Sequence, residues 1–371
     1  MKKLFCLILS CSILLVSVIS VHAEDVEISA GAYVLYCPDN GKMLLSENAD
    51  NELPMASTTK IMTTLLTLEE AASDNRIVEF TDEMTAEGSS MYLKRGEKVT
   101  LYDLAVGMMM QSGNDAANAA AISIAGSNEA FADLMNEKAA EIGMTHTHFV
   151  TPSGLDDEDH FSTAHDMALL MAYALNNEDF AHITAQTSME VHFVYPADKF
   201  MTYPNHNKLL RMYQDCIGGK TGYTDAAGRC LVSAAHRHDH TLIADTLNDH
   251  DDWDDHVALY EEGFAKYKAI SVSADIDTIN VVGGDAESVL LKADQVRIVV
   301  PKDMESISTQ VCLPSFLYAS VKEDEPIGKI ICRSNEKVLA EVSIKAAGSV
   351  DYDDRKRSLF IYIKDLLHWH S

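Results

Sequence analysis

Hydrophobic and polar residues alternate along residues 27–47, which is the pattern of paired β-strands with one buried face. The runs Ala30 to Tyr36 and Lys42 to Ser46 flank the turn signal Asp39-Asn40-Gly41, so a β-hairpin is predicted here. From Ser57 the period changes to that of a helix. The apolar positions that show this period are Ile61, Met62, Leu65, Leu66 and Leu68.

Further helical patterns follow between residues 101 and 175. The predicted helices are Leu101 to Met110, Ala116 to Ala125, Glu129 to Ile142 and Thr163 to Leu175. A short turn from Ser112 to Asp115 separates the first two of them. Residues 216–247 then alternate again, with turns at Thr224-Asp225 and from Arg237 to Asp239. This pattern predicts antiparallel strands that return to pair with the first hairpin.

The character of the chain changes near Ser271, where short β-rich runs are separated by turns and no helical period remains. We therefore expect a large mixed domain over residues 24–268 and a small all-β domain over residues 271–350. Beyond them, residues 355–371 place apolar side chains on one helical face after a basic triplet. This segment is too short to span a bilayer. It is suited either to a membrane surface or to packing on the β domain.

The N-terminus has the three parts of a secretory signal peptide. Lys2 and Lys3 precede an apolar run from Leu4 to Val21, and small residues end at Ala23. We expect cleavage after Ala23, so that residues 1–23 are removed and the protein is exported. An uncleaved membrane anchor is the alternative, because the apolar run approaches spanning length.

Charge excludes one class of partner. The formal net charge is −28, and it becomes −30 without residues 1–23, because they contain Lys2, Lys3 and no acid. Such a protein repels nucleic acid, so no nucleic-acid partner is expected. The acidic runs Asp156 to Asp159 and Asp249 to Asp252 are interpreted as solvated faces.

Cysteines and histidines indicate no metal centre. No CxxC or HExxH motif occurs, and no cofactor is expected. Five cysteines follow the signal segment, at positions 37, 216, 230, 312 and 332. Cys216 with Cys230 and Cys312 with Cys332 are conceivable disulfides in an oxidising envelope, while buried free thiols are the simpler alternative. A hairpin that turns near Thr224 would bring Cys216 close to Cys230.

Three short motifs occur in an order that carries chemistry: Ser57-x-x-Lys60, then Ser112-Gly113-Asn114, then Lys220-Thr221-Gly222. Each motif alone is weak, because single matches of this length are common by chance. Their order and their predicted elements together predict an enzyme with an acyl-serine intermediate.

Ser57 is the predicted nucleophile, since it starts a helix with Lys60 one turn away on the same face. A serine hydroxyl needs a base, and Lys60 can be that base only if its pKa falls from about 10.4 toward neutrality. Burial and a second cation, Lys220, are the available causes. Ser112 is expected to relay a proton to the leaving amine.

The remaining motif residues are expected to bind substrate. The Asn114 amide would hold Lys60 and the substrate backbone. Lys220 and Thr221, on a strand edge facing the cleft, would receive a carboxylate and an extended chain. Gly222 lets the substrate approach the backbone, and the N–H of Tyr223 is a candidate oxyanion donor beside that of Ser57.

At these residues the chain resembles the low-molecular-mass penicillin-binding proteins, the serine-type D-alanyl-D-alanine carboxypeptidases. The likeness covers residues 26–268 and includes the stretches 112–116, 149–155 and 219–224. It implies an α+β fold of the penicillin-recognising transpeptidase type, similar to serine β-lactamases, with an antiparallel sheet, a helical subdomain and a following all-β domain. It also implies removal of the terminal D-alanine from peptidoglycan pentapeptide stems, and inhibition by β-lactams.

Two other functions are weighed against this one. A serine β-lactamase needs a deacylating carboxylate, but no Glu-x-x-Leu-Asn occurs between Asn114 and Lys220. A non-catalytic penicillin-binding envelope protein would not need the full set of Ser57, Lys60, Ser112 and Lys220. Many members of the resembled family carry an arginine beyond the Lys-Thr-Gly strand that helps bind the terminal carboxylate. The corresponding stretch here, residues 248–250, is Asn-Asp-His.

Overall fold

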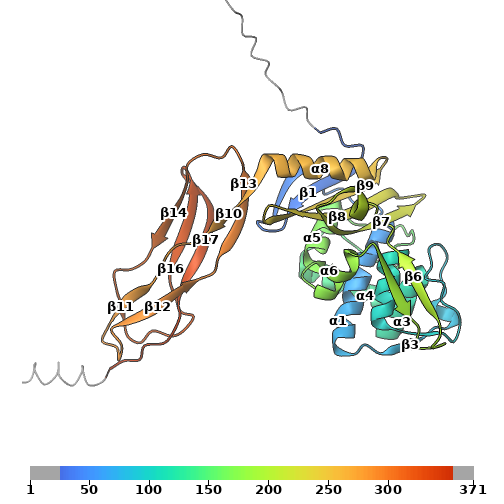
Figure 1. The fold of residues 1–371 in the computed structure, drawn as a ribbon, viewed down its shortest axis with the longest axis horizontal. Coiled ribbons are helices and arrows are strands. Elements are labelled where there is room, and N and C mark those ends of the chain that lie inside the picture. The colour runs from blue at the N-terminus through green and yellow to red at the C-terminus, as the bar shows by residue number, and fades with distance from the viewer. Residues whose placement is uncertain (1–25, 354–371) are drawn as a thin grey trace, which may run out of the picture.

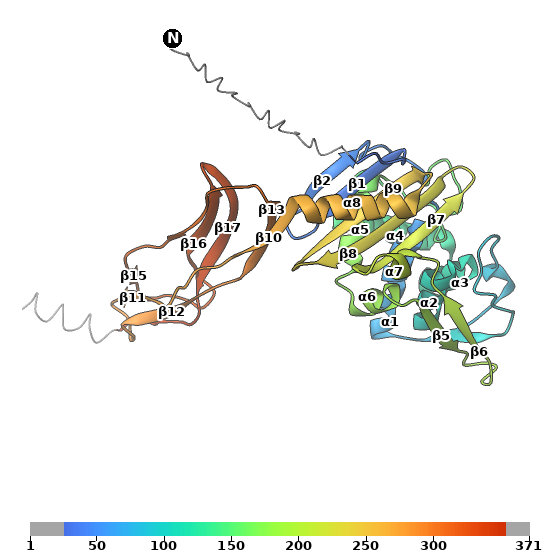
Figure 2. The ribbon, with the colours of Figure 1, turned by 45° about the horizontal axis from the view of Figure 1, so that its top comes forward.

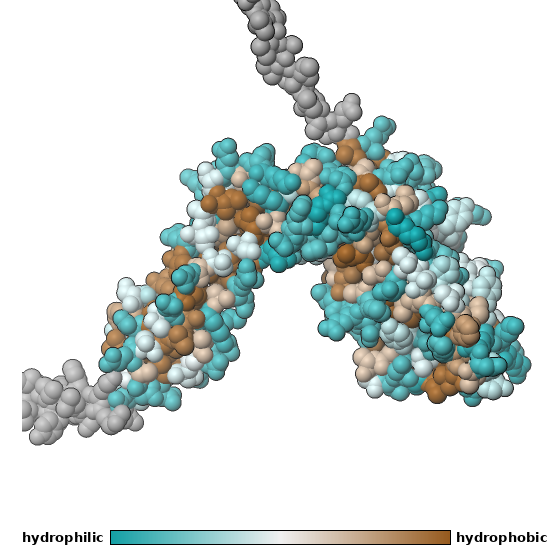
Figure 3. Space-filling model, in the orientation of Figure 1, coloured by the Kyte–Doolittle hydropathy of each residue, from teal (hydrophilic) through white to brown (hydrophobic). Residues whose placement is uncertain are grey.

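The computed structural model describes residues 26–353, which form two lobes (Figure 1). The larger lobe combines a sheet with a group of helices, and its last helix, α8 (Asp252–Lys266), leads into a lobe made of strands. Figure 3 shows hydrophilic residues over most of the visible face around α8 and a run of hydrophobic residues along the β-rich lobe.

A five-stranded antiparallel sheet forms the centre of the larger lobe (Figure 2). Its strands are β1 (Ala32–Cys37), β2 (Lys42–Glu47), β7 (Cys216–Thr224), β8 (Gly228–Arg237) and β9 (His240–Asp249), in the order β2-β1-β9-β8-β7. The predicted return of the later strands to the first hairpin is confirmed, because β1 pairs with β9. Strand β7 is at the sheet edge, so its outer backbone groups can pair with an extended peptide.

Helices pack on one face of this sheet and continue into a helical subdomain, which also contains two short hairpins. The helices are η1 (Ala56–Thr59), α1 (Lys60–Ser73), η2 (Asp82–Met84), α2 (Leu101–Gln111), α3 (Asn114–Ala125), α4 (Asn128–Ile142), α5 (Ala164–Ala174), α6 (Glu178–Thr184) and α7 (Leu209–Met212). The hairpins are β3 (Ile77–Glu79) with β4 (Lys98–Thr100), and β5 (Ser188–His192) with β6 (Phe200–Pro204). Thr100, Ser127 and Thr163 cap α2, α4 and α5, each accepting a backbone N–H three residues along.

Helix α8 (Asp252–Lys266) covers the other face of the sheet and was not predicted. Its apolar residues Leu259, Tyr260 and Phe264 pack on β8 and β9. The interpretation of residues 249–252 as a solvated face holds for His250 and Asp251, which are exposed, but it is wrong for the two outer acids. Asp249 and Asp252 are only 1% and 3% exposed. The acidic run was interpreted as solvated surface, so the start of the helix was not recognised. Acidic residues are in fact favoured in the first turn of a helix, because they interact well with the helix dipole.

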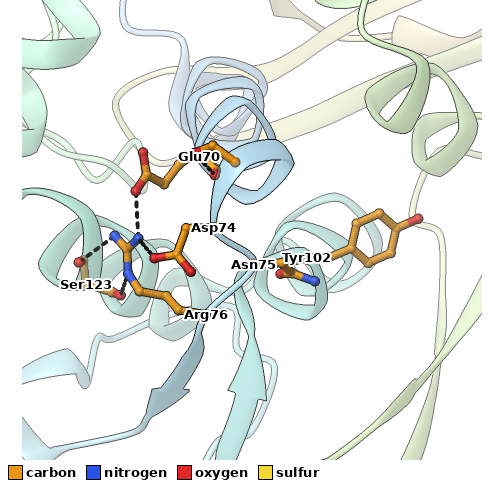
Figure 4. Close-up of polar contacts among 7 residues, drawn as sticks. Glu70, Asp74, Asn75, Arg76, Tyr102 and Ser123 are labelled. Atoms are coloured by element: carbon orange, nitrogen blue, oxygen red, sulfur yellow. Dashed lines mark hydrogen bonds and ion pairs between the residues drawn. The ribbon is translucent and has the colours of Figure 1, made fainter.

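A polar cluster ties the end of α1 to α3 (Figure 4). The Arg76 guanidinium donates to Glu70 Oε1 at 2.6 Å and to Asp74 Oδ2 at 2.9 Å. It also donates to the Ser123 carbonyl, near the C-terminus of α3, at 3.0 Å. One planar cation therefore bonds two carboxylates and a helix-terminal carbonyl, which fixes the loop that follows α1.

The β-rich lobe has its own hydrophobic core. Its strands are β10 (Tyr267–Val272), β11 (Thr278–Val282), β12 (Ser288–Ala293), β13 (Val296–Pro301), β14 (Ile307–Cys312), β15 (Leu317–Tyr318), β16 (Pro326–Ser334) and β17 (Lys337–Ala346). Strand β14 was not predicted, because it is an edge strand and four of its six residues are exposed, so it shows no buried alternation. The Asn40 side chain donates to the Val299 carbonyl at 2.7 Å and connects the two lobes.

The predicted proximity of Cys216 and Cys230 is wrong. The β7–β8 hairpin does turn after Thr224, but Cys216 pairs with Ala235 and Cys230 pairs with Gly222. The two thiols therefore lie toward opposite ends of the hairpin. Cys312 and Cys332 pair with Lys329 and Thr309 on neighbouring strands. All five described cysteines are free thiols.

An isolated carboxyl group lies in the core of the sheet, and it gives a testable prediction. Asp245 is fully buried on β9 between Val34 and Val232, and neither of its oxygens has a hydrogen-bond partner within the described chain. Burial, aided by the charge of Asp249, raises the pKa of Asp245 well above its ordinary 3.8. The folded protein therefore keeps a proton that the unfolded chain releases above about pH 4, so stability falls as pH rises through that window.

Asp245→Val should accordingly raise the free energy of unfolding by about 1–3 kcal/mol and flatten its dependence on pH. Urea unfolding at several pH values between 5 and 8 measures both effects. Asp245→Asn is the matched control: it removes the titration but keeps an unpaired polar group, so it should flatten the pH dependence with less stabilisation. A valine variant less stable than the parent would show that the carboxyl makes favourable contacts in solution.

The predicted signal peptide, residues 1–23, and the predicted tail, residues 355–371, lie outside the described residues. Within residues 26–353 no helix is long and apolar enough to cross a membrane.

Candidate active site

The segment that carries Ser57 has an unusual backbone. Ser57 lies in the 3-10 turn η1, just before α1, and not in the first turn of the α-helix itself. Ala56 has φ +48°, a value that residues with a side chain rarely adopt. The strained turn places Ser57 at the end of α1, where its hydroxyl lines a cleft of ≈ 480 Å³.

The loop that contains Gly154 and His160 packs against this turn and holds it in place. Gly154 has φ +80°, and a Cβ there would collide with the Ala56 carbonyl, so only glycine fits. Thr59 donates its hydroxyl to the same carbonyl at 2.8 Å and lies 2.9 Å from His160 Nε2. His160 Nδ1 accepts the Val150 N–H at 2.9 Å, so Nε2 carries the proton and donates to Thr59. Burial lowers the pKa of His160 to about 4, which keeps it neutral.

Lys60 lies one turn along from Ser57 and is completely buried. Its Nζ is 2.9 Å from Ser57 Oγ and donates to the Ser153 carbonyl at 2.6 Å. Burial first, and then the charge of Lys220, lower the pKa of Lys60 well below its ordinary 10.5, while Asp115 opposes them. A neutral amine in hydrogen-bond contact with a hydroxyl is the arrangement that a general base requires.

Ser112 and Lys220 form a second pair. Ser112 ends α2 in a left-handed conformation, φ +57°, which turns its side chain into the cleft. Lys220 Nζ donates to Ser112 Oγ at 3.0 Å and to the Thr221 carbonyl at 2.7 Å. The expectation that Lys220 faces the cleft is wrong: its strand is at the edge, but the side chain is 1% exposed. Burial lowers the pKa of Lys220 to about 7.

Asn114 is fixed to the wall of the cleft and not to Lys60. Its Nδ2 donates to the Glu87 carbonyl at 2.6 Å, and its backbone N–H donates to the Ser89 carbonyl at 2.8 Å. Asn114 Oδ1 is buried without a hydrogen-bond partner in the described chain, so the expected bond to Lys60 is not formed. That oxygen is a buried acceptor that is left unused within the described chain.

Asp115, directly after it, anchors the same wall. Its carboxylate accepts the Met91 N–H at 2.7 Å, the Leu93 N–H at 3.1 Å and the Ser90 hydroxyl at 2.7 Å. The loop that borders the cleft is therefore held to the start of α3 by charge-assisted hydrogen bonds.

Strand β7 forms the opposite wall, with Thr221, Gly222 and Tyr223 lining the cleft. Gly222 packs on the turn that carries Ser57: a Cβ there would lie 3.0 Å from the Met55 carbonyl and 3.1 Å from the backbone nitrogen of Ser57. A side chain at this position would therefore press on the backbone of that turn.

The structure thus brings all eight predicted site residues to one place, with five lining the cleft and Lys60, Lys220 and Asn114 behind its walls. Sequence reasoning missed five residues that also line it: Ser89, His206, Arg229, Asp252 and Trp253. They belong to no short motif, and only the fold gathers them. No group of histidine, cysteine and acidic residues within residues 26–353 has the geometry to hold a metal ion.

Comparison with known proteins gives one consistent result. The model of a family described as D-alanyl-D-alanine carboxypeptidase matches residues 18–251. The chain is 30% identical over 348 residues to D-alanyl-D-alanine carboxypeptidase DacF of Bacillus subtilis, covering 90% of this chain and 87% of the relative. It is 32% identical over 343 residues to DacC of Escherichia coli, covering 86% and 83%. Penicillin-binding protein 5 of Haemophilus influenzae has a similar structure, with a TM-score of 0.75 and 27% identity over 88% of this chain and 99% of that one.

Proposed function

Because this chain belongs to the D-alanyl-D-alanine carboxypeptidase family and is a serine peptidase of that class, we propose that Ser57, Lys60 and Ser112 carry its chemistry. The reaction removes the terminal D-alanine from peptidoglycan pentapeptide stems and so limits cross-linking. The observation that carries the residue assignment is the 2.9 Å contact between a fully buried Lys60 and Ser57 Oγ.

In the first step the neutral Lys60 amine takes the Ser57 proton as the Ser57 oxygen attacks the carbonyl between the two D-alanines. The carbonyl oxygen becomes an oxyanion, for which the backbone N–H groups of Ser57 and Tyr223 are the proposed donors. The contact of Gly222 with the Ser57 backbone supports that pairing.

In the second step the tetrahedral intermediate collapses, and the bond to the leaving D-alanine nitrogen breaks. Ser112 lines the cleft beside Lys220, and in this proposal it relays to that nitrogen the proton that Lys60 took from Ser57, which makes Lys60 neutral again. Water then attacks the acyl-Ser57 ester while Lys60 takes its proton, and that proton passes to the Ser57 oxygen as the ester bond breaks. The product is a tetrapeptide stem with Ser57 regenerated.

The substrate lies, in this proposal, as an extended strand beside β7, with Asn114, behind the opposite wall, as the proposed partner of a substrate backbone N–H. Thr221, Gly222 and Tyr223 line its path. A β-lactam would acylate Ser57 in the same position. We also propose an extracytoplasmic location, with residues 355–371 contacting a membrane surface; both rest on the sequence pattern.

The purified protein should release free D-alanine from diacetyl-Lys-D-Ala-D-Ala, and penicillin should block the release. Both products are measured in one experiment, D-alanine from the peptide and penicilloate from the drug. Rapid penicillin hydrolysis without D-alanine release would make the chain a β-lactamase. If neither D-alanine nor penicilloate is released, the result would favour a non-catalytic binding protein.

A further inference from the structure

One permanent cation faces the cleft. Among the described residues that line it, Arg229 alone carries a fixed positive charge. Lys220 is buried and already donates to Ser112 and to the Thr221 carbonyl. The pKa of His206 is lowered by burial and by Lys220, so it is neutral. A carboxylate that enters the cleft therefore meets Arg229 as its main positive charge.

The strand register puts Arg229 on the side of Thr221. Tyr223 pairs with Arg229 across β7 and β8, and Thr221 pairs with Leu231. Paired residues project to the same face of a sheet, and alternate residues along a strand share that face. Arg229, Tyr223 and Thr221 are therefore neighbours on one face, whereas Lys220 projects to the other face, toward Ser112.

Asp252 fixes the position of the Arg229 guanidinium. It is the first residue of α8, its side chain is 4% exposed, and its Oδ1 accepts a hydrogen bond from Arg229 Nη2. The Arg229 side chain is 44% exposed, so its other N–H donors remain accessible. A guanidinium fixed in this way loses little conformational entropy when it binds a second carboxylate.

We propose that Arg229 receives the free terminal carboxylate of the stem peptide, and that Asp252 is the residue that positions it. This inference rests on the proposed function. It adds the residue that would distinguish a peptide with a free terminal carboxylate from other peptides. A planar guanidinium can bind a carboxylate through two parallel hydrogen bonds, which a C-terminal amide or an internal peptide bond cannot accept in the same way. The residue stands on β8 and pairs with Asp249 of β9, so it lies beside residues 248–250, where the family resemblance pointed.

The test compares two substrates, diacetyl-Lys-D-Ala-D-Ala and its C-terminal amide. The parent enzyme should prefer the free acid. Arg229→Gln should lower kcat/KM for the acid at least about tenfold, while kcat/KM for the amide changes less than about threefold. Arg229→Lys keeps the positive charge but cannot form the two parallel hydrogen bonds, so its decrease in kcat/KM for the acid should be intermediate. Lys208→Gln is the matched control: it removes a cation beside Trp253 that does not line the cleft, and it should retain the preference.

Asp252→Ala should raise KM for the acid with a smaller effect on kcat, and Asp252→Glu should recover part of the loss. Equal losses on both substrates in Arg229→Gln, or the same loss in Lys208→Gln, would overturn the inference. A parent enzyme that releases no D-alanine from either substrate would instead overturn the proposed function.

Discussion

Ser57→Ala should abolish both D-alanine release and covalent labelling by a fluorescent penicillin. Every step of the proposed reaction passes through the Ser57 oxygen, and no other hydroxyl in the cleft has a buried amine within hydrogen-bond distance on its own helical turn. Loss of a serine nucleophile in comparable hydrolases lowers kcat on the order of 10⁶-fold. Labelling after gel electrophoresis and intact-protein mass spectrometry give the two readouts.

Ser89→Ala provides the matched control, because Ser89 also lines the cleft but has no assigned part in the chemistry. This variant should label at close to the parental rate. An adduct that peptide mapping places on Ser112, or on any residue other than Ser57, would contradict the assignment.

The parts of the fold that sequence predicted are those with a clear period. The apolar residues of the hairpin at residues 32–47, the helices α2 to α5 and the strands β7 to β9 recur regularly enough to identify each element, although β8 and β9 are buried on both faces. The site motifs were visible for a related reason. Ser57 and Lys60 must share one helical turn, and Lys220 to Gly222 must be consecutive on one strand, so the chemistry fixes their spacing.

The missed features depend on contacts between distant segments. Asp252 looks solvated in sequence, and it is buried only because α8 folds over the sheet next to Arg229. His160 supports the turn that carries Ser57 through its contact with Thr59, although the two residues are more than one hundred positions apart in the sequence. The burial of Lys220 follows from the packing of η1 and α6 against β7 and from the hydrogen bond to Ser112, which no local pattern encodes. Long-range contacts of this kind carry no fixed sequence spacing.

Replacing Lys60 should have the second-largest effect on activity. Lys60→Met removes the base but keeps an unbranched side chain of similar length, and loss of a general base lowers kcat/KM by about 10²–10⁴-fold. Lys60→Arg introduces a permanent positive charge, and a guanidinium cannot accept a proton near neutrality, so this variant should be as inactive as Lys60→Met. The acylation rate with penicillin, measured in stopped flow, separates this effect from later hydrolysis. A methionine variant that acylates at the parental rate would assign the base to another group.

The dependence of kcat/KM on pH tests the same assignment of Lys60 as the base. The base works only when neutral, so kcat/KM should rise with pH through the pKa of Lys60 in the free enzyme. The charge of Lys220 is one of the two causes that lower this pKa. Lys220→Met removes that repulsion, so the pKa of Lys60 should rise and the acidic limb should move to higher pH. The same variant also loses the bond to Ser112, which should cost at least about tenfold in kcat/KM at neutral pH. An acidic limb that stays in place or moves to lower pH would mean that burial alone sets the pKa of Lys60, and that Lys220 acts only through Ser112.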